Sequence, residues 1–275
     1  MRLNWQRFLN IMIYISKFLS AAVALTTVFF ISNSYGQNSP PPRALSPPPL
    51  ESSSPQVKAK DKISIGTGFF ITDNGYLITS NHVINKFSSL FVIFPDARKL
   101  PAKLIRFDEV NDLALLKVDA ITSFLYLSHS QGVPAGMEVV TIGYPHVGIQ
   151  GFAPKITQGI VNSPSGLKDD KNSFQFSAEV QKGNSGGPLI GPGGTVVGVV
   201  RSKLNALLMS QNTNDLSQNV NFATKSIKLL DLIKDLPNLP TTRNVDPEQP
   251  MRPIRIYSES KISIYPVLAL DSKEE

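Results

Sequence analysis

The sequence predicts an all-β fold, a barrel or a sandwich. Asn74-Gly75 lies between two strand-like apolar runs in ISIGTGFFITDNGYLITSNHVI, and this arrangement is typical of a β-hairpin. Turn residues then separate strand-like runs at intervals of about ten residues, and no long helical period comes between them. Short strands at this spacing favour a barrel or a sandwich over a parallel sheet covered by helices. The further predicted strands span 89–94, 102–108, 113–118, 138–144, 155–163, 173–179 and 195–202.

The N-terminus has the pattern of an export signal. Basic residues in MRLNWQRFLN precede an apolar run over 18–31, and the small-residue stretch SNSYG follows it. The run is shorter than the about 20 residues that a membrane-spanning helix needs, which favours a signal peptide over 1–36 that is cleaved after Gly36. IMIYIS before Lys17 is also apolar, so a longer segment kept as a signal anchor is the alternative.

Three further segments follow. Residues 37–58 are rich in proline and serine and predict a solvated linker. Residues 59–236 form the predicted domain, which ends in an amphipathic helix within 224–236 whose apolar positions include Ile227, Leu230 and Ile233. Residues 237–275 predict a proline-containing tail, in which only KISIYPVLAL can form a strand. Pro266 confines that strand to the edge of a sheet, because proline lacks an N–H.

Composition excludes several classes of function. The chain of 275 residues has no cysteine, so disulfides, thiolate nucleophiles and cysteine-bound metals are ruled out. The formal charge is +6, but three of the basic residues lie within 1–36, where no acidic residue occurs. Without them, 24 basic and 21 acidic residues give a balance of +3, which is too small and too scattered to indicate nucleic acid.

Ser185 in QKGNSGGPLIG is either a nucleophile or an ordinary turn residue. A serine nucleophile needs a base to accept its proton and an acid to orient that base. Of the three histidines, His82 ends a predicted strand, and Asp112 opens the apolar strand DLALLKV. The N–H groups of Gly183 and Ser185 are natural donors to an oxyanion. Taken singly, each of these residues also fits a purely structural role.

Together, GTGFFITDNGYLITSNHVI, NDLALLKV and GNSGGPL resemble, in this order, the trypsin-like (chymotrypsin-fold) serine peptidases, and most closely their Deg/HtrA-type branch. The resemblance covers about residues 63–235. It implies two six-stranded antiparallel β-barrels with a C-terminal helix. It also implies His82 as general base, Asp112 as orienting acid, Ser185 as nucleophile, and Gly183 with Ser185 as the oxyanion hole.

The chain also departs from the family. Asn184 stands where digestive members have an aspartate that pairs with a newly cut N-terminus, so activation by clipping is not expected. The 237–275 segment is shorter than a usual domain of about 50 residues, so no PDZ domain is expected. Three roles stay open for this tail: folding over the peptidase, binding a partner, or none.

The substrate pocket is less clearly predicted. By resemblance, SAEVQK and GVVRSK line it, so that Glu179 would attract a basic side chain and Arg201 or Lys203 an acidic one. An ion pair between Glu179 and Arg201 is the structural alternative.

The sequence thus predicts an exported serine endopeptidase, periplasmic or secreted, that acts on proteins or peptides without metal, cofactor or nucleic acid. Contact with a membrane is expected only if the N-terminal segment is not cleaved. Two alternatives remain: a weakly active or inactive module that binds or chaperones unfolded segments, and a membrane-anchored regulatory protease.

Overall fold

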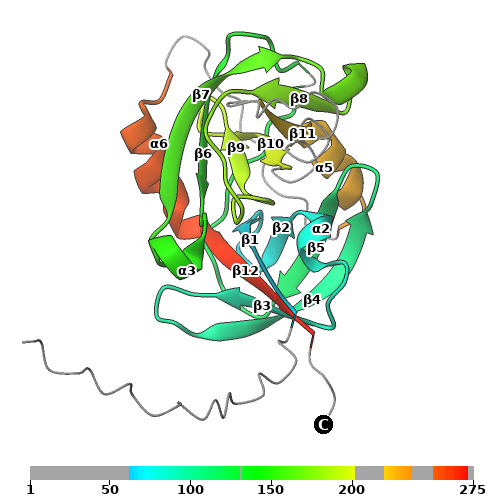
Figure 1. Ribbon diagram of the computed structural model, residues 1–275, viewed down its shortest axis with the longest axis vertical. Coiled ribbons are helices and arrows are strands. Elements are labelled where there is room, and N and C mark those ends of the chain that lie inside the picture. The colour runs from blue at the N-terminus through cyan, green and yellow to red at the C-terminus, as the bar shows by residue number, and fades with distance from the viewer. Residues whose placement is uncertain (1–61, 131, 202–219, 237–249, 272–275) are drawn as a thin grey trace, which may run out of the picture. The chain divides into compact units, whose positions relative to one another are not determined.

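The computed structural model describes residues 62–130, 132–201, 220–236 and 250–271. These residues form two closed six-stranded antiparallel barrels with a few short helices (Figure 1). The predicted all-β fold class is therefore confirmed. The predicted signal segment, the linker and Lys203 lie outside the described residues.

The first barrel has the strand order β1-β12-β3-β4-β5-β2. Alternate apolar residues of its strands fill the interior, among them Phe70, Leu77, Val92 and Leu116. The predicted hairpin joins β1 to β2, and its turn has Gly75 at φ 93°, where a side chain would meet the Val118 carbonyl. The strands are β1 (Ile63–Phe70), β2 (Tyr76–Thr79), β3 (Ser89–Ile93), β4 (Lys99–Asp108), β5 (Leu113–Val118) and β12 (Ile264–Leu270).

The second barrel has the order β10-β11-β8-β7-β6-β9 and is filled by Phe174, Phe176, Val139 and Leu189. β9 was not predicted, because three residues beside a glycine-rich loop give no readable alternation. The strands are β6 (Glu138–Gly143), β7 (Lys155–Ser163), β8 (Ser173–Phe176), β9 (Pro188–Ile190), β10 (Val196–Val200) and β11 (Asn221–Lys225).

The helices are short and lie at strand ends. The predicted closing helix begins two residues later than expected, because Thr224 and Lys225 continue β11, and it buries Leu229 and Ile233. No helix among the described residues is long and apolar enough to cross a membrane. The helical elements are α2 (Asn81–Ile84), α3 (Val147–Gln150), η1 (Leu167–Asp169), α5 (Ser226–Ile233), α6 (Pro253–Ser260) and η2 (Lys261–Ser263).

β12, drawn in red in Figure 1, corrects the prediction for the C-terminal segment. It lies between β1 and β3 in the closed first barrel, so residues 264–270 belong to the barrel, and the predicted edge strand is wrong. Pro266 is tolerated because β12 pairs with β3 only from Val267 onward. On the other side, Pro266 faces Thr67, whose N–H donates to the Ser185 carbonyl and whose carbonyl accepts from Thr79. No ladder bond is lost at the proline.

An apolar layer joins the two barrels. One continuous cluster contains Phe69 and Leu115 of the first barrel together with Ile142 and Val199 of the second. Tyr144, which follows β6, donates from its hydroxyl to the Ile264 carbonyl of β12 at 2.9 Å. Burial raises the pKa of Tyr144, so the hydroxyl stays a neutral donor in this position. The candidate site lies where the two barrels meet.

Candidate active site

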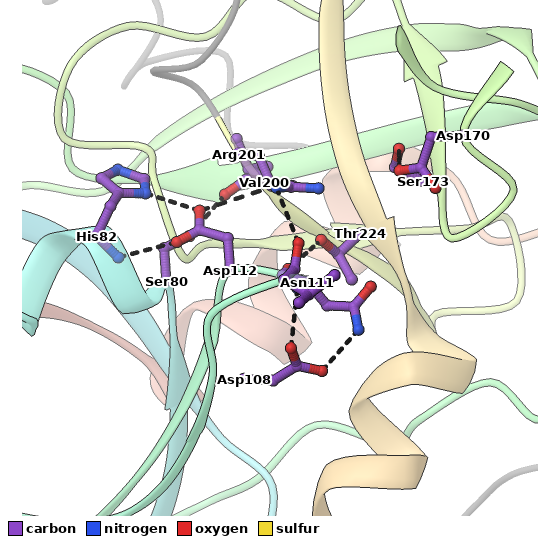
Figure 2. Close-up of polar contacts among 11 residues, drawn as sticks. Ser80, His82, Asp108, Asn111, Asp112, Asp170, Ser173, Val200, Arg201 and Thr224 are labelled. Atoms are coloured by element: carbon purple, nitrogen blue, oxygen red, sulfur yellow. Dashed lines mark hydrogen bonds and ion pairs between the residues drawn. The ribbon is translucent and has the colours of Figure 1, made fainter. Parts of the chain in front are cut away.

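His82 and Asp112 form a close pair (Figure 2). His82 is on α2, the short helix that directly follows β2, and Asp112 immediately precedes β5. Nδ1 of His82 lies 2.7 Å from Oδ2 of Asp112, and the His82 backbone N–H donates to Oδ1 at 2.8 Å. Two hydrogen bonds from one residue to one carboxylate fix the plane of the imidazole ring. They leave Nε2 of His82 as the ring atom available for proton transfer.

Asp112 is held by the turn between β4 and β5. Its φ of 55° is left-handed, a conformation that aspartate tolerates better than most residues. Asn111 braces the turn, because its backbone N–H and side-chain amide both donate to the Asp108 carboxylate, at 3.0 and 2.6 Å. The Asn111 carbonyl in turn accepts from the hydroxyl of Thr224 on β11, at 2.7 Å. Contacts from both barrels thus set the position of Asp112.

Ser185 lies in a tight turn before β9. Gly183 and Gly186 on either side have φ values of 109° and 84°, which strongly favour glycine. A side chain on Gly186 would collide with Thr67, Thr79 and Ser80. The glycines that the sequence placed around Ser185 are therefore required both by conformation and by close packing on the first barrel.

Thr67 on β1 anchors this turn. Its N–H donates to the Ser185 carbonyl at 2.8 Å, and its hydroxyl donates to the Gly183 carbonyl at 2.6 Å. The same hydroxyl accepts the N–H of Tyr144 at 3.1 Å. Thr67 is completely buried. Sequence reasoning did not single it out, although a threonine between two glycines in a strand-like run was a visible signal.

The elements that carry His82 and Ser185 converge on one atom. The Val200 carbonyl accepts from Ser80, two residues before His82, at 3.2 Å, and from the N–H of Gly186 at 2.9 Å. A Cβ on Gly66 would lie 2.7 Å from Val83 and 3.0 Å from the Ser185 carbonyl oxygen. The helix with His82 and the turn with Ser185 are thus in direct contact.

Gly183 and Asn184 complete the turn. The Gly183 N–H donates to no described residue, and Asn184 is buried, with its side chain beside Gly143. A backbone N–H that makes no bond to the described residues suits a donor to a substrate oxyanion.

Of the three predicted pocket residues, the structure describes Glu179 and Arg201. The Glu179 side chain is exposed, and its carbonyl accepts from the Thr157 hydroxyl. Arg201 lies beside Asp112, with Nε 4.0 Å from Oδ2, and makes no ion pair with Glu179 among the described residues. Lys203 is not described. A pocket role for all three residues stays a prediction.

Comparison with known proteins bears on the family of this chain. The family model of the trypsin-like peptidase domain matches residues 66–199. In the search of curated proteins, a probable periplasmic serine endoprotease, DegP-like, of Rhizobium meliloti is 42% identical over 141 residues. The chain carries a Deg/HtrA-type trypsin-like peptidase domain.

The matches to this peptidase domain are partial. The Rhizobium relative is matched over 49% of the present chain and 27% of its own length. An uncharacterized protein of Sinorhizobium fredii is 43% identical over 66% of this chain and 29% of its own. The crystal structure of a serine endoprotease from Yersinia pestis superposes with a TM-score of 0.51 at 26% identity, covering 63% of this chain and 57% of that one. The chain spans less than a third of the length of these two curated relatives.

Proposed function

We propose that this protein is an exported serine endopeptidase that hydrolyses peptide bonds in protein substrates through Ser185, His82 and Asp112. The 2.7 Å contact between His82 and Asp112, beside the turn that carries Ser185, is the observation that supports it most. The DegP-like relative is named a periplasmic serine endoprotease, which supports both the activity and export.

In this proposal, each of these residues has a role in one step of acyl transfer. The Ser185 hydroxyl attacks the scissile carbonyl while Nε2 of His82 accepts its proton, and Asp112 stabilises the imidazolium through Nδ1–H. The N–H groups of Gly183 and Ser185 stabilise the oxyanion of the tetrahedral intermediate. His82 then gives its proton to the leaving amine, and an acyl-Ser185 ester remains. Water, deprotonated by His82, hydrolyses this ester and restores the serine.

The test compares the purified protein with its Ser185→Ala variant on unfolded casein and with a fluorophosphonate probe. We expect kcat to fall by about 10⁵- to 10⁶-fold in the variant and labelling to disappear, because the nucleophile is absent. Ser130→Ala is the matched control, since Ser130 is an exposed serine whose hydroxyl bonds with Gly132 in its own loop.

Two results would contradict the proposal. Undiminished casein hydrolysis by Ser185→Ala would remove Ser185 from the mechanism. Folded wild-type protein that binds casein but neither cleaves it nor reacts with the probe would instead be a binding module.

A further inference from the structure

Arg201 is a buried cation directly behind the candidate catalytic pair. It follows β10, and its side chain is 16% exposed. Its Nε lies 4.0 Å from Oδ2 of Asp112, and its Nη2 donates to the Val110 carbonyl at 3.4 Å. Nε is buried and has no hydrogen-bond partner among the described residues. Figure 2 shows Arg201 on the side of Asp112 away from the His82 ring.

A nearby cation would offset the desolvation of the Asp112 carboxylate. Its carboxylate is 7% exposed, and the hydrogen bonds that it accepts from the described residues both come from His82. A carboxylate with this little water around it loses much solvation, and two hydrogen bonds leave some of its lone pairs unused. A positive charge nearby offsets this loss.

The separation matters as much as the charge. At 4.0 Å the Arg201 Nε is beyond hydrogen-bonding distance of Oδ2, so it acts through its charge. Oδ2 therefore stays directed at Nδ1 of His82, and the arginine does not compete with the histidine for that oxygen.

We propose that Arg201 is a positioning residue whose charge holds the Asp112 carboxylate aimed at His82 and so sustains kcat. This inference rests on the proposed peptidase function. It differs from the sequence-based expectation that Arg201 binds an acidic substrate side chain, because the guanidinium faces the catalytic carboxylate.

Arg201 acts on Asp112 in the presence of other charges. Among the described residues, the charged groups near this cluster include Asp170 before β8, Asp108 and Glu109 at the β4–β5 turn, Lys225 on β11 and Lys228 on α5.

The charge of Arg201 also acts on a second carboxylate, that of Asp170. Burial by itself would raise the pKa of Asp170, but hydrogen bonds from Ser173 and Asn172 and the charges of Arg201 and Lys225 lower it below its ordinary value. Arg201 therefore acts on two carboxylates, on Asp170 through its charge and on Asp112 at 4.0 Å.

The experiment measures kcat and KM on a peptide substrate near neutral pH for wild type, Arg201→Gln and Arg201→Lys. For Arg201→Gln we expect kcat to fall about tenfold and KM to change little, because the carboxylate that orients His82 loses its neighbouring charge. Arg201→Lys, which keeps the charge, should recover most of the lost kcat. Arg106→Gln is the matched control, because Arg106 also faces a carboxylate, Asp235 at 3.4 Å, but away from the site.

Each outcome decides the matter. An unchanged kcat in folded Arg201→Gln overturns the inference, and so does an equal fall of kcat in the lysine variant. A rise in KM confined to substrates with acidic side chains would restore the pocket role. If Arg201→Gln does not fold, Arg201→Met is used in its place, and a kcat close to wild type for Arg201→Lys is still required. Failure of the peptidase proposal is distinct, because Ser185→Ala would then keep its activity.

Discussion

At the residue scale, Thr67 shows how one side chain ties the candidate nucleophile turn to the barrel beneath it. Its hydroxyl joins the Gly183 carbonyl to the Tyr144 N–H, and its backbone N–H holds the Ser185 carbonyl. Thr67, Tyr144, Gly183 and Ser185 are all buried, so bulk water does not reach these groups to replace a lost partner. The orientation of the peptide groups around Gly183 therefore depends on this threonine.

Replacing Thr67 by valine keeps the shape of the side chain and removes the hydroxyl. We expect kcat/KM to fall about 10- to 100-fold, because two buried backbone groups lose partners at about 1–3 kcal/mol each and the turn relaxes. Thr67→Ser should keep most of the activity. The measurement is peptide hydrolysis together with the rate of fluorophosphonate labelling.

A buried threonine elsewhere separates this role from general destabilisation. Thr122 donates to the Thr72 carbonyl at 3.1 Å on the far side of the first barrel's hairpin. Thr122→Val should lower the melting temperature and leave the labelling rate per folded molecule unchanged. Equal losses of labelling in both variants would argue against a positioning role for Thr67.

At the element scale, the β4–β5 turn determines where Asp112 points. Burial alone would raise the pKa of Asp108, but the hydrogen bonds from the Asn111 side chain and backbone outweigh it and lower that pKa below its ordinary value. A carboxyl whose pKa is lowered by folding stabilises the native state above its unfolded pKa of about 3.9. This contribution is lost as the pH falls through the folded value.

Asp108→Ala tests the turn by its pH dependence. We expect the variant to be less stable than wild type at pH 7 by up to about 1 kcal/mol, a modest value because water screens this partly exposed site. The difference should shrink towards pH 3, because the unfolded chain gains its proton on Asp108 at about pH 3.9 and the folded state gains its own at a lower pH. Urea unfolding at the two pH values measures it.

Asp231→Ala is the control, because Asp231 meets Lys228 on the surface of α5 at 3.2 Å and should contribute little at either pH. A loss for Asp108→Ala that is the same at pH 7 and pH 3 would show that the ionised carboxylate does not brace the turn.

At the scale of the whole molecule, the C-terminal strand completes the N-terminal barrel. β12 pairs with β1 along its length and with β3 over its second half, and Val267 and Ala269 are buried inside. Removing it would expose two strand edges and an apolar interior. It would also remove the Ile264 carbonyl that Tyr144 binds across the barrels.

Truncation after residue 249 should therefore abolish cooperative unfolding and probe labelling, even though His82, Asp112 and Ser185 are all retained. Circular dichroism melts and fluorophosphonate labelling measure the two effects. Truncation after Asp271 serves as the control, because it keeps the whole of β12. A folded, labelled protein without β12 would show that five strands suffice for the first barrel.

The sequence by itself determined the parts of this protein that depend on local pattern. Alternating apolar residues and the Asn-Gly turn predicted the strands. Ser185 among glycines, with His82 and Asp112 after and before strands, supplied the candidates, and the resemblance of the three segments to the trypsin-like peptidases implied their roles. These signals can be read because a strand or a tight turn restricts which residues fit at each position. The predicted start of the closing helix at residue 224 was wrong, because local propensity does not say where strand pairing stops.

Only the tertiary structure decided which distant segments meet. Pro266 predicted an edge strand. In the structure Pro266 lies opposite Thr67, whose N–H donates to the Ser185 carbonyl and not to β12. β12 therefore closes the barrel without losing a hydrogen bond at the proline. Arg201 reads in the sequence as a pocket residue, yet it lies against Asp112. Pairings over such separations in the chain depend on burial and on which backbone groups remain unsatisfied. Both are properties of the assembled barrels and not of any one segment.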